Sequence, residues 1–584
     1  VTAGWQFHDL SFSQGELQRE KMKQLLAVQL DAPMKNQAPM LRVQLVRLEP
    51  AVHCVVMQLP HIISDVWTEH ILAEDLSELY SAFQQSRAPS LPELDVRYVD
   101  YAEWHQKRLD SEVMQAQKNY WLELFSNGST PLGLDRTSAA GAKQSADHQV
   151  LHLSKALMTR LKQLAGDQGA TLFVVLLAAF QTLLARLTGT TDVAVGTAVS
   201  GRAHPDLERV AGFFMNPLCL RSDVSGNPTF FELLGRVRQT VLSALANQEY
   251  PFQQWLHALR RKHGSNDLYP YSLVLLVEEQ PKDLSFAGAR AYFEPLPGYG
   301  FDLNRVAGPQ LSVRVSEGPD NWCVEIIPGT MDKTPAPAGL LARWAQLLEE
   351  IVAHPHDRIG EFDLLAKHEK KALSSFSSGT QTNTKLIELA TEFQRAGGQG
   401  FSIVTADGRI ANVVTGLADS VVFTQALSGP KVKALVADAE TLEKLAERGV
   451  AIRKMAHDLE RVIVCAPSQC DVGLISRSLG VKVSAFVPLD EEAEVLLWID
   501  DFNSGVFAGR PVGAASVLVL DEWDKVTPIG VRGRLYKKSE NAGAAEPEPL
   551  PWFGRWQTDG TLEINTRHFD TLELDAEELE ELLR

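Results

Sequence analysis

The sequence predicts an α/β protein with several domains, and three observations lead to this fold class. The first is length, since 584 residues correspond to about three or four domains, or two large ones. The second is composition, because 45% hydrophobic and 22% charged residues are typical of a globular chain that buries several cores. The third is pattern, because β-branched apolar runs alternate with helical patterns along most of the chain.

The net charge and the cysteines of the chain indicate which partners it binds and in which compartment it works. The chain carries 56 Lys and Arg against 74 Asp and Glu, a net charge of −18, which disfavours nucleic acid and anionic membranes as partners. Part of the excess is local, in the acidic end Glu573–Glu581. The five cysteines are scattered: Cys54, Cys219, Cys323, Cys465 and Cys470. Their odd number and wide spacing indicate reduced thiols in a cytosol, and their spacing is not that of zinc ligands. The sequence therefore predicts a cytoplasmic protein with no bound metal.

No segment has the pattern of a signal peptide or of a membrane span. The longest apolar run, Leu172–Leu184, carries Gln181 and is too short and too amphipathic to cross a bilayer. The chain begins at Val1 in the middle of a pattern, so we expect it to be a piece of a longer protein.

A possible site lies at the end of an early strand. Residues Ala51–Leu59 are apolar and β-branched, which predicts a buried strand, and a helix is expected from Thr68 to Tyr80. Between them His61 leaves the strand into a turn, and Asp65 follows four residues later. An imidazole there has a pKa near neutrality and could take or guide a proton. The alternative is a structural His beside an Asp that caps the next helix, and these residues alone leave both open.

The remaining patterns divide the chain into three parts. In the first part we expect a helix at Leu10–Leu30, a strand at Pro39–Leu48, one long amphipathic helix at Arg97–Leu124 and a linker at Gly128–Lys143. In the second we expect a strand at His148–Leu153, a helix at Lys155–Leu164, a buried helix at Thr171–Leu187 capped by Gly189, a strand at Asp192–Val199, a helix at Thr229–Asn247, strands at Tyr271–Leu276, Leu311–Val315 and Trp322–Ile327, and a closing helix at Pro337–Ala353.

The third part has a small α/β pattern of its own. Strands are expected at residues 421–427, 432–437, 461–466 and 481–487, with short helices between them. Residues Ser516–Tyr536 and Thr561–Arg567 have the composition of β structure, and an acidic helix is expected at Asp575–Leu583.

Five ordered motifs give the chain a resemblance to the condensation domains of nonribosomal peptide synthetases. Residues His61–Asp65 resemble the back half of that family's His-His-x-x-x-Asp-Gly motif. The other four are Tyr98–Trp104, which resembles an aromatic helix; Thr171–Phe173 through Gly189 with Asp192–Arg202, which resemble a floor helix and strand; Gly212–Pro217, similar to Gly-x-Phe-Val-Asn-Thr; and Asn247–Phe252, similar to His/Asn-Gln-Asp-x-Pro-Phe.

The resemblance implies a particular architecture. It implies two lobes of the chloramphenicol-acetyltransferase type, each an α/β sandwich, forming a V with a central tunnel. We expect the first lobe at residues 1–132, the second at 133–356, a linker at 357–373 and a further part at 374–584. The family has a longer stretch before its His motif, so we expect the first lobe to lack its first strand and helix.

The resemblance also implies a reaction and a set of site residues. Two substrates carried as 4′-phosphopantetheine thioesters on upstream and downstream carrier domains would be joined, with His61 as the catalytic residue. Asp65 would be structural at the site, pairing with an Arg of the second lobe, with Arg202 the first candidate and Arg221 the second. The residues expected along the tunnel or at the substrate are Pro60, Ser64, Val66, Trp67, Asn216 and Tyr250.

Two positions depart from the family's motif. Pro60 stands where the family has its first His; it fixes φ and removes an N–H donor, so the loop is expected to be re-aimed. Val66 stands where the family has Gly, and it adds bulk at a wall that a pantetheine arm would approach.

The part at 374–584 resembles an adenylation domain that has lost much of its length. The resemblance is carried by Gly509–Gly513, Val517–Asp521 and Pro528–Tyr536. Its ATP machinery is expected to be absent: Ser377–Lys385 lacks the second Gly of a phosphate loop and lies too early in the chain, and Pro549–Phe553 replaces the ribose-binding Thr-Gly-Asp. We therefore expect no ATP binding, no carrier motif and a scaffold or spacer role beside neighbouring synthetase domains.

Three functions follow from these residues. The first is an amide-forming condensation domain, favoured by His61, Asp65 and the second lobe. The second is a catalytically silent docking module that passes the chain on unchanged, favoured by Pro60 and Val66. The third is ester formation, in which a hydroxyl acceptor uses the same His.

Overall fold

The computed structural model describes residues 4–31, 40–128, 149–265, 268–278, 285–291, 311–318, 321–328, 339–365, 367–377 and a series of short stretches between 401 and 564. The chain forms two compact units. Unit 1 comprises Val1–Ser129, Ala194–Arg221 and Gln239–Asp332; unit 2 comprises Thr130–Val193, Ser222–Arg238 and Lys333–Arg584. These units follow contacts in space rather than chain order, so the predicted boundaries at 132, 356 and 373 stay predictions.

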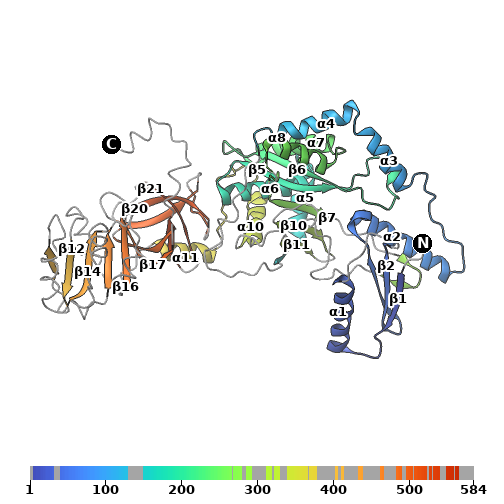
Figure 1. Ribbon diagram of the computed structural model, residues 1–584, viewed down its shortest axis with the longest axis horizontal. Helices are drawn as coiled ribbons and strands as arrows, with labels where there is room; N and C mark the ends of the chain where they lie inside the picture. The colour runs from blue at the N-terminus through green and yellow to red at the C-terminus, as the bar shows by residue number, and fades with distance from the viewer. Residues whose placement is uncertain are drawn as a thin grey trace. The chain divides into compact units, whose positions relative to one another are not determined.

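Unit 1 begins with a small α/β layer. Its elements are β1 (Gly4–Asp9), α1 (Gly15–Asp31), β2 (Arg42–Glu49), β3 (Val52–Gln58), the 3-10 turn η1 (His61–Ile63) and α2 (Val66–Gln84). The strand order is β1-β2-β3, with β1 parallel and β3 antiparallel to β2. Helix α1 lies alongside this sheet (Figure 1), where the Gln18 amide donates to the carbonyl oxygens of Leu10 (3.1 Å) and Leu48 (2.8 Å). Strand β1 has no counterpart among the sequence predictions.

The prediction of a buried strand before His61 is half wrong. Strand β3 forms where it was expected, but Val52 and Val55 are 44% and 43% exposed. The reason is that β3 is an edge strand of a three-stranded sheet in the described part of the chain. An apolar, β-branched composition predicts a strand, but it does not show how much of that strand its neighbours cover.

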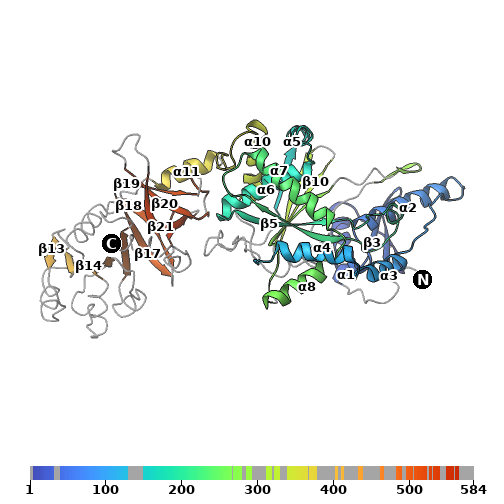
Figure 2. The same cartoon turned by 90° about the horizontal axis from the view of Figure 1, so that it is seen from above.

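The predicted long helix at Arg97–Leu124 is two helices, α3 (Tyr98–Arg108) and α4 (Glu112–Leu124). The chain breaks because Ser111 caps α4, its hydroxyl accepting from the Met114 N–H at 3.4 Å. Helix α4 lies beside α8 (Phe252–His263), which the sequence did not predict (Figures 1 and 2). Trp121 and Trp255 stack between them, with ring centroids 5.4 Å apart.

A second sheet carries the strands that follow. Within it the order is β11-β10-β7-β5-β6, with β7 parallel to β10 and β5 and with β10 antiparallel to β11. The bounds are β5 (Asp192–Val199), β6 (Asn216–Asp223), β7 (Leu273–Glu278), β10 (Leu311–Glu317) and β11 (Asn321–Pro328), with the turn η3 (Pro205–Leu207), helix α7 (Phe230–Ala246) and the hairpin β8 (Ser285–Phe286) and β9 (Ala289–Arg290). The predicted strand at Asp192–Val199 is confirmed to the residue.

Unit 2 contains the most buried helix of the described chain. Its first elements are β4 (Gln149–Ser154), α5 (Lys155–Asp167), α6 (Leu172–Thr188), α10 (Leu340–Ala353) and α11 (Lys367–Ser377). The prediction for α6 is confirmed: Thr171 caps its start and Gly189 ends it with a φ of 68°. Helices α5 and α10 pack on α6 (Figure 2), and the rings of Phe180 and Trp344 lie 5.2 Å apart.

The last part of unit 2 is an eleven-stranded sheet in the order β13-β12-β14-β15-β16-β17-β18-β22-β21-β20-β19. Its strands are β12 (Phe401–Thr405), β13 (Ile410–Val413), β14 (Val432–Asp438), β15 (Arg461–Cys465), β16 (Lys482–Pro488), β17 (Val495–Asn503), β18 (Val506–Gly513), β19 (Ala515–Leu520), β20 (Gly533–Ser539), β21 (Glu548–Trp556) and β22 (Leu562–Ile564). The three predicted strands at 432–437, 461–466 and 481–487 are confirmed as β14–β16, which run parallel. The predicted strand at 421–427, the linker after residue 128 and the helix at 575–583 lie outside the described residues.

A buried ion pair joins α6 to the end of β19 within unit 2. The Arg186 guanidinium lies 2.7 Å from an Asp521 carboxylate oxygen, with side-chain exposures of 3% and 8%. The same guanidinium donates to three main-chain carbonyls, those of Ile359, Gly360 and Phe362. Helix α11 also packs on β19, as Figure 2 shows.

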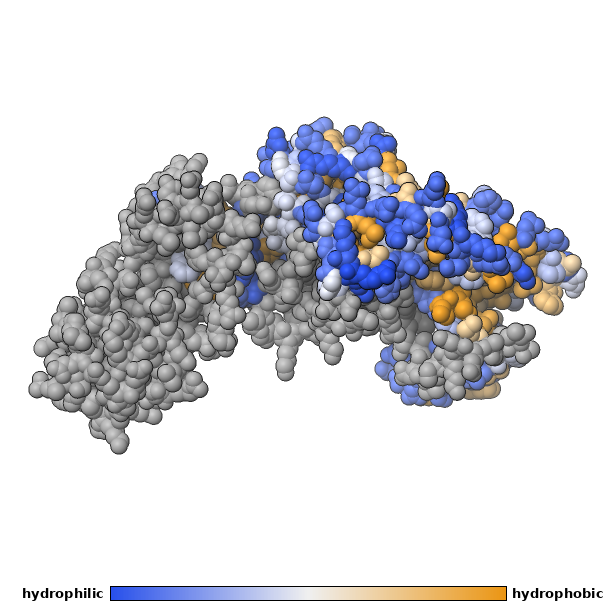
Figure 3. Space-filling view, turned by 45° about the horizontal axis from the view of Figure 1, so that its top comes forward, coloured by the Kyte–Doolittle hydropathy of each residue, from blue (hydrophilic) through white to orange (hydrophobic). Residues whose placement is uncertain are grey.

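The described helices can be compared with the prediction that no segment spans a membrane. Among the described residues no single helix is long and apolar enough to span a membrane, while one bent pair, α5 with α6, passes on length and composition alone. On the face drawn in Figure 3 the described surface is largely hydrophilic, with apolar side chains in small groups.

Candidate active site

His61 begins the short turn η1 directly after β3. Pro60 precedes it with a φ of −68°, the value its ring enforces. The Nδ1 atom of His61 lies 2.5 Å from the Ser64 carbonyl oxygen, which can only accept, so Nδ1 carries the proton and donates. In the neutral imidazole, Nε2 then holds the lone pair.

The surroundings of His61 favour the neutral form. The Phe213 ring packs against the imidazole at 5.0 Å between centroids, with the planes at 86°. Burial lowers the pKa of His61 below its ordinary value of 6.5, and this outweighs the Ser64 carbonyl and the Asp65 charge, which both raise it. The lowered pKa therefore favours the neutral imidazole, whose lone pair lies on Nε2.

Asp65 caps helix α2 and forms an ion pair at the same time. Its Oδ1 accepts from the Thr68 main-chain N–H at 2.8 Å and from the Thr68 hydroxyl at 2.9 Å. Its two oxygens also face the Arg202 guanidinium, at 2.7 Å and 3.1 Å, with side-chain exposures of 4% for Asp65 and 1% for Arg202. The structure thus contains both the cap that the structural alternative for these residues named and the ion pair that the resemblance implied.

The pKa of Asp65 reflects this pairing. Burial alone would raise the pKa of Asp65, but hydrogen bonds and charge from Arg202, with the N–H groups of Thr68 and Phe214, hold it below its usual value. The carboxylate is therefore ionised and does not compete with His61 for a proton at neutral pH.

The two arginine candidates lie in different places. Arg202 also donates to the carbonyls of Val210 (3.2 Å) and Gly212 (3.3 Å), and it lies 4.3 Å over the Phe214 ring. Arg221 instead donates to the Leu124 and Gly128 carbonyls at 2.6 Å and 3.2 Å, at the end of α4. The partner of Asp65 is thus Arg202, and the structure does not bring Arg221 to the site.

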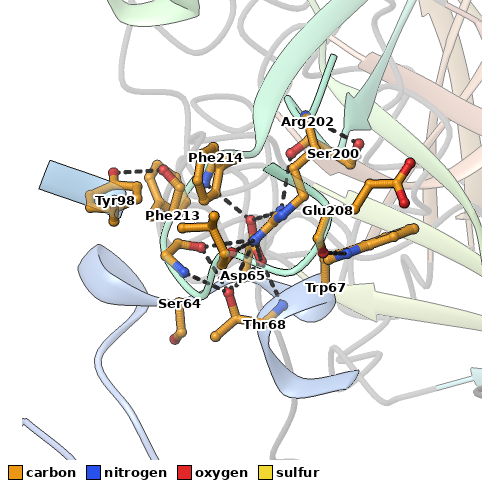
Figure 4. A network of polar contacts seen from close by, with 12 residues as sticks. Ser64, Asp65, Trp67, Thr68, Tyr98, Ser200, Arg202, Glu208, Phe213 and Phe214 are labelled. Carbon is orange, nitrogen blue, oxygen red and sulfur yellow. Dashed lines mark hydrogen bonds and ion pairs between the residues drawn. The ribbon is translucent and has the colours of Figure 1, made fainter. Parts of the chain in front are cut away.

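A loop of three residues, Gly212–Phe214, is held against this cluster and is called the Gly212 loop below (Figure 4). The Gly212 N–H donates to the Thr68 hydroxyl oxygen at 3.0 Å, and the Phe214 N–H donates to Asp65 at 3.1 Å. The Tyr98 hydroxyl donates to the Phe213 carbonyl at 2.8 Å. Sequence reasoning recognised these residues as a motif but did not connect them to His61.

Two glycines allow this close packing. A Cβ on Gly212 would lie 2.1 Å from the Tyr98 ring. Gly201, next to Arg202, has a φ of +67°, and a Cβ there would lie 1.9 Å from the Phe214 carbonyl oxygen. A side chain at either position would push the Gly212 loop away from the cluster.

The other predicted residues surround the cluster or lie apart from it. The Ser64 hydroxyl donates to the Pro60 carbonyl at 3.2 Å, Val66 is the first residue of α2, and the Trp67 indole N–H donates to the Glu208 carbonyl at 2.8 Å. None of these contacts assigns a substrate role to its residue.

Asn216 and Tyr250 lie together at another turn. The Asn216 side-chain amide donates to the carbonyls of Gln248 (2.8 Å) and Tyr250 (2.9 Å), and its oxygen accepts from the Phe252 N–H (2.9 Å). Both N–H donors of Asn216 are therefore used by the main chain. Over the described ranges of the chain, no group of three or more His, Cys, Asp and Glu residues could hold a metal ion.

Comparisons with known proteins place this chain in a family. The family model described as "Condensation domain" matches residues 2–374. A linear gramicidin synthase protein of Brevibacillus parabrevis is 42% identical over 244 residues, 41% of this chain and 5% of that protein. Gramicidin S synthase 2 of Brevibacillus brevis is 32% identical over 348 residues, 58% of this chain and 7% of that protein. The chain thus spans a small fraction of the length of these relatives.

Solved structures agree on the fold. The starter condensation domain of rhizomide synthetase matches with a TM-score of 0.52 at 22% identity, covering 62% of this chain and 81% of that one. The first condensation domain of the calcium-dependent antibiotic synthetase matches with a TM-score of 0.50 at 20% identity, covering 62% and 78%. With the family model covering more than half of its length, the chain belongs to the condensation domain family of nonribosomal peptide synthetases.

Proposed function

We propose that this chain joins an acyl thioester on one carrier domain to an amine on another, forming an amide. The acceptor nitrogen forms a C–N bond to the donor carbonyl carbon, and the C–S bond to the donor's pantetheine arm breaks. The nitrogen loses one proton and the departing sulfur gains one, so no oxidant or reductant is required. The observation that carries this proposal is the neutral His61, whose Nδ1 is committed to the Ser64 carbonyl and whose Nε2 holds the lone pair.

Each residue of the cluster has a separate role in this proposal. His61 would accept or guide the acceptor's proton and stabilise developing charge, while the two arms supply proximity. Asp65 and Arg202 are positioning residues, because their polar atoms bind each other, α2 and the Gly212 loop.

The two departures from the family motif are compatible with this role. Pro60 lacks an N–H, but its φ of −68° is an ordinary value and its carbonyl accepts from the Ser64 hydroxyl, which closes the turn around His61. Val66 begins α2, and the position of Asp65 as the cap of that helix is kept. We infer that the motif retains its geometry and that Val66 acts on substrate fit.

We further propose that residues 374–584 are a degenerate adenylation-like scaffold that binds no ATP, and that the protein works in the cytoplasm beside neighbouring synthetase domains. The buried Arg186–Asp521 pair supports a structural role, since it ties this part to α6. An amino-acid-dependent ATP–pyrophosphate exchange assay with the twenty common amino acids should give no signal, and exchange with any of them would overturn the scaffold proposal.

A second function has one observation in its favour. The Nε2 atom of His61 is buried, which is what a silent docking module would show. Transfer of an acyl group between carriers, measured by intact mass for wild type and His61→Ala, separates condensation, docking and ester formation. Product from wild type alone supports condensation; binding of carriers without product supports docking; and product only with a hydroxyacyl acceptor supports ester formation.

A further inference from the structure

The ring that packs against His61 belongs to a residue that the family motif leaves variable. Phe213 is the x of Gly-x-Phe in the Gly212 loop, and its ring lies edge-on to the imidazole at 5.0 Å. The Nε2 atom, on which the proposed chemistry depends, is buried. An acceptor amine therefore needs a movement before it can reach that nitrogen.

The main chain of the loop is not free to make this movement. It is bound at three successive residues: the Gly212 N–H at Thr68, the Phe213 carbonyl at Tyr98 and the Phe214 N–H at Asp65. The last contact belongs to the buried pair with Arg202, and withdrawing the loop would leave buried charge and N–H groups unpaired. Opening by a shift of the loop is therefore costly.

The two phenylalanines of the loop differ in how they are held. Phe214 is buried, under the Arg202 guanidinium at 4.3 Å and against Tyr98 at 5.1 Å. Phe213 is only half-buried, and Figure 4 shows it on the Tyr98 side of the cluster. A partly exposed side chain changes rotamer on a far faster timescale than a bound loop moves. Rotation of the Phe213 ring is thus a faster way to open the space beside the imidazole than a shift of the Gly212 loop.

We propose that the Phe213 side chain is a positioning and selecting element for the acceptor: it covers Nε2 of His61 and, by rotating aside, leaves a space whose size limits which amine can bind. The role of Phe213 in selecting the acceptor rests on the proposed function. Its role in covering His61 does not. Phe213 acts through His61 and through shape, and it takes no part in proton transfer.

The first experiment measures the cover without activity. Diethyl pyrocarbonate modifies neutral, accessible imidazoles, so its rate at His61 can be followed by peptide mass in the full chain. Phe213→Ala should raise that rate several-fold and Phe213→Leu by less. Phe83→Ala is the control, because Phe83 is 82% exposed at the far end of α2. Unchanged rates in both Phe213 variants would overturn the cover.

The second experiment measures selection, with the native downstream carrier loaded with glycine or with phenylalanine. Phe213→Ala should raise the ratio of kcat/KM for phenylalanine over glycine by roughly tenfold, since a pocket wall loses most of a ring. It should also move the acid limb of the pH–rate profile to higher pH, because better hydration of the imidazole raises the pKa of His61. The charged and titratable groups around His61 (Asp65 on its own turn, Arg202 after β5 and Tyr98 on α3) are unchanged in this variant.

The outcomes separate the two proposals. If wild type forms product, His61→Ala does not, and Phe213→Ala shows the wild-type ratio and pH limb, the selecting role is overturned and the proposed function stands. If wild type forms no product while Phe213→Ala raises the modification rate, the proposed function and the acceptor role are overturned and the cover stands. Hydrogen exchange at the Gly212 loop amides shows whether each variant keeps the native cluster.

Discussion

Asp65 and Arg202 are 137 residues apart in the sequence, and their side chains meet through two hydrogen bonds of 2.7 Å and 3.1 Å in a buried position. This pair connects the turn that carries His61 to the loop that carries Phe213, because Asp65 also accepts the Phe214 N–H. The geometry of the candidate site therefore depends on a buried charge pair as well as on His61.

Removing one partner of this pair should loosen the Gly212 loop. Arg202→Ala leaves a buried carboxylate without its counter-charge, which typically costs about 3–5 kcal/mol. Hydrogen exchange at the Gly212 and Phe214 amides should accelerate by roughly 100-fold. The matched control is Arg209→Ala, since Arg209 pairs with Glu74 and Asp75 at the surface, where such pairs contribute about 1 kcal/mol or less. Equal exchange rates in both variants would contradict the structural role of Arg202.

A side chain at Gly201 should be more damaging than a side chain at another glycine of similar backbone conformation. Gly201 and Gly226 have φ values of +67° and +82°, but only at Gly201 would a Cβ collide with main chain, 1.9 Å from the Phe214 oxygen. Gly226→Ala should cost about 1–2 kcal/mol for the left-handed conformation alone. Gly201→Ala should cost clearly more and should also release the Phe214 amide in hydrogen exchange. Equal thermal stability of the two variants would argue against the close approach.

Protonation of His61 should set the acid limit of transfer. Its pKa lies below 6.5, so the neutral base persists at pH 6.5 and the rate should fall only at lower pH. Stability should follow the same sign. The unfolded chain binds a proton at His61 before the folded chain does, so the free energy of unfolding decreases as the pH falls below 6.5. Asp65, with its lowered pKa, adds a further loss as the pH falls below 3.8 and through its folded value.

A pH–rate profile of wild type, with urea unfolding at the same pH values, tests this prediction. His61→Gln should remove the first decrease in stability and leave the second. An acid limb centred above the ordinary pKa of histidine would contradict the buried, neutral imidazole.

The contact between α6 and β19 should be essential for the stability of unit 2. Asp521→Ala removes the Asp521 charge from the buried Arg186, which also faces three main-chain carbonyls, at a cost of about 3–5 kcal/mol. The double variant Arg186→Met with Asp521→Leu should recover part of that loss, since apolar pairs replace buried ion pairs well. Glu548→Gln is the control, because Glu548 is 72% exposed in its pair with Lys537. Limited proteolysis that cleaves Asp521→Ala no faster than Glu548→Gln would contradict this coupling.

The sequence predicted most accurately the helices whose first and last residues are marked by capping residues. Helix α6 was predicted within a residue because Thr171 caps its start and Gly189 supplies a left-handed end. The helix at Arg97–Leu124 was predicted as one because its amphipathic pattern continues across Ser111, whose capping hydrogen bond depends on the actual backbone. Strand β1 was missed because its short sequence, GWQFHD, has only two large apolar residues.

The site was predicted in part, through the resemblance to a family. That resemblance led to His61 and Asp65, with Arg202 as the first candidate for the partner of Asp65. The second candidate, Arg221, binds the end of α4 instead. The contact of Phe213 with His61 could not be predicted, because it joins residues that no periodic pattern relates. Only the three-dimensional path of the Gly212 loop brings them together.

A carrier-to-carrier transfer assay read by intact mass tests catalysis at His61 most directly. The native upstream acyl carrier and the native downstream aminoacyl carrier are mixed with wild type or His61→Ala, and carrier binding is measured in parallel. We predict that wild type moves the acyl mass onto the downstream carrier and that His61→Ala binds both carriers but forms little or no product. Product at the wild-type rate from His61→Ala, or none from wild type with both carriers bound, would contradict catalysis at His61.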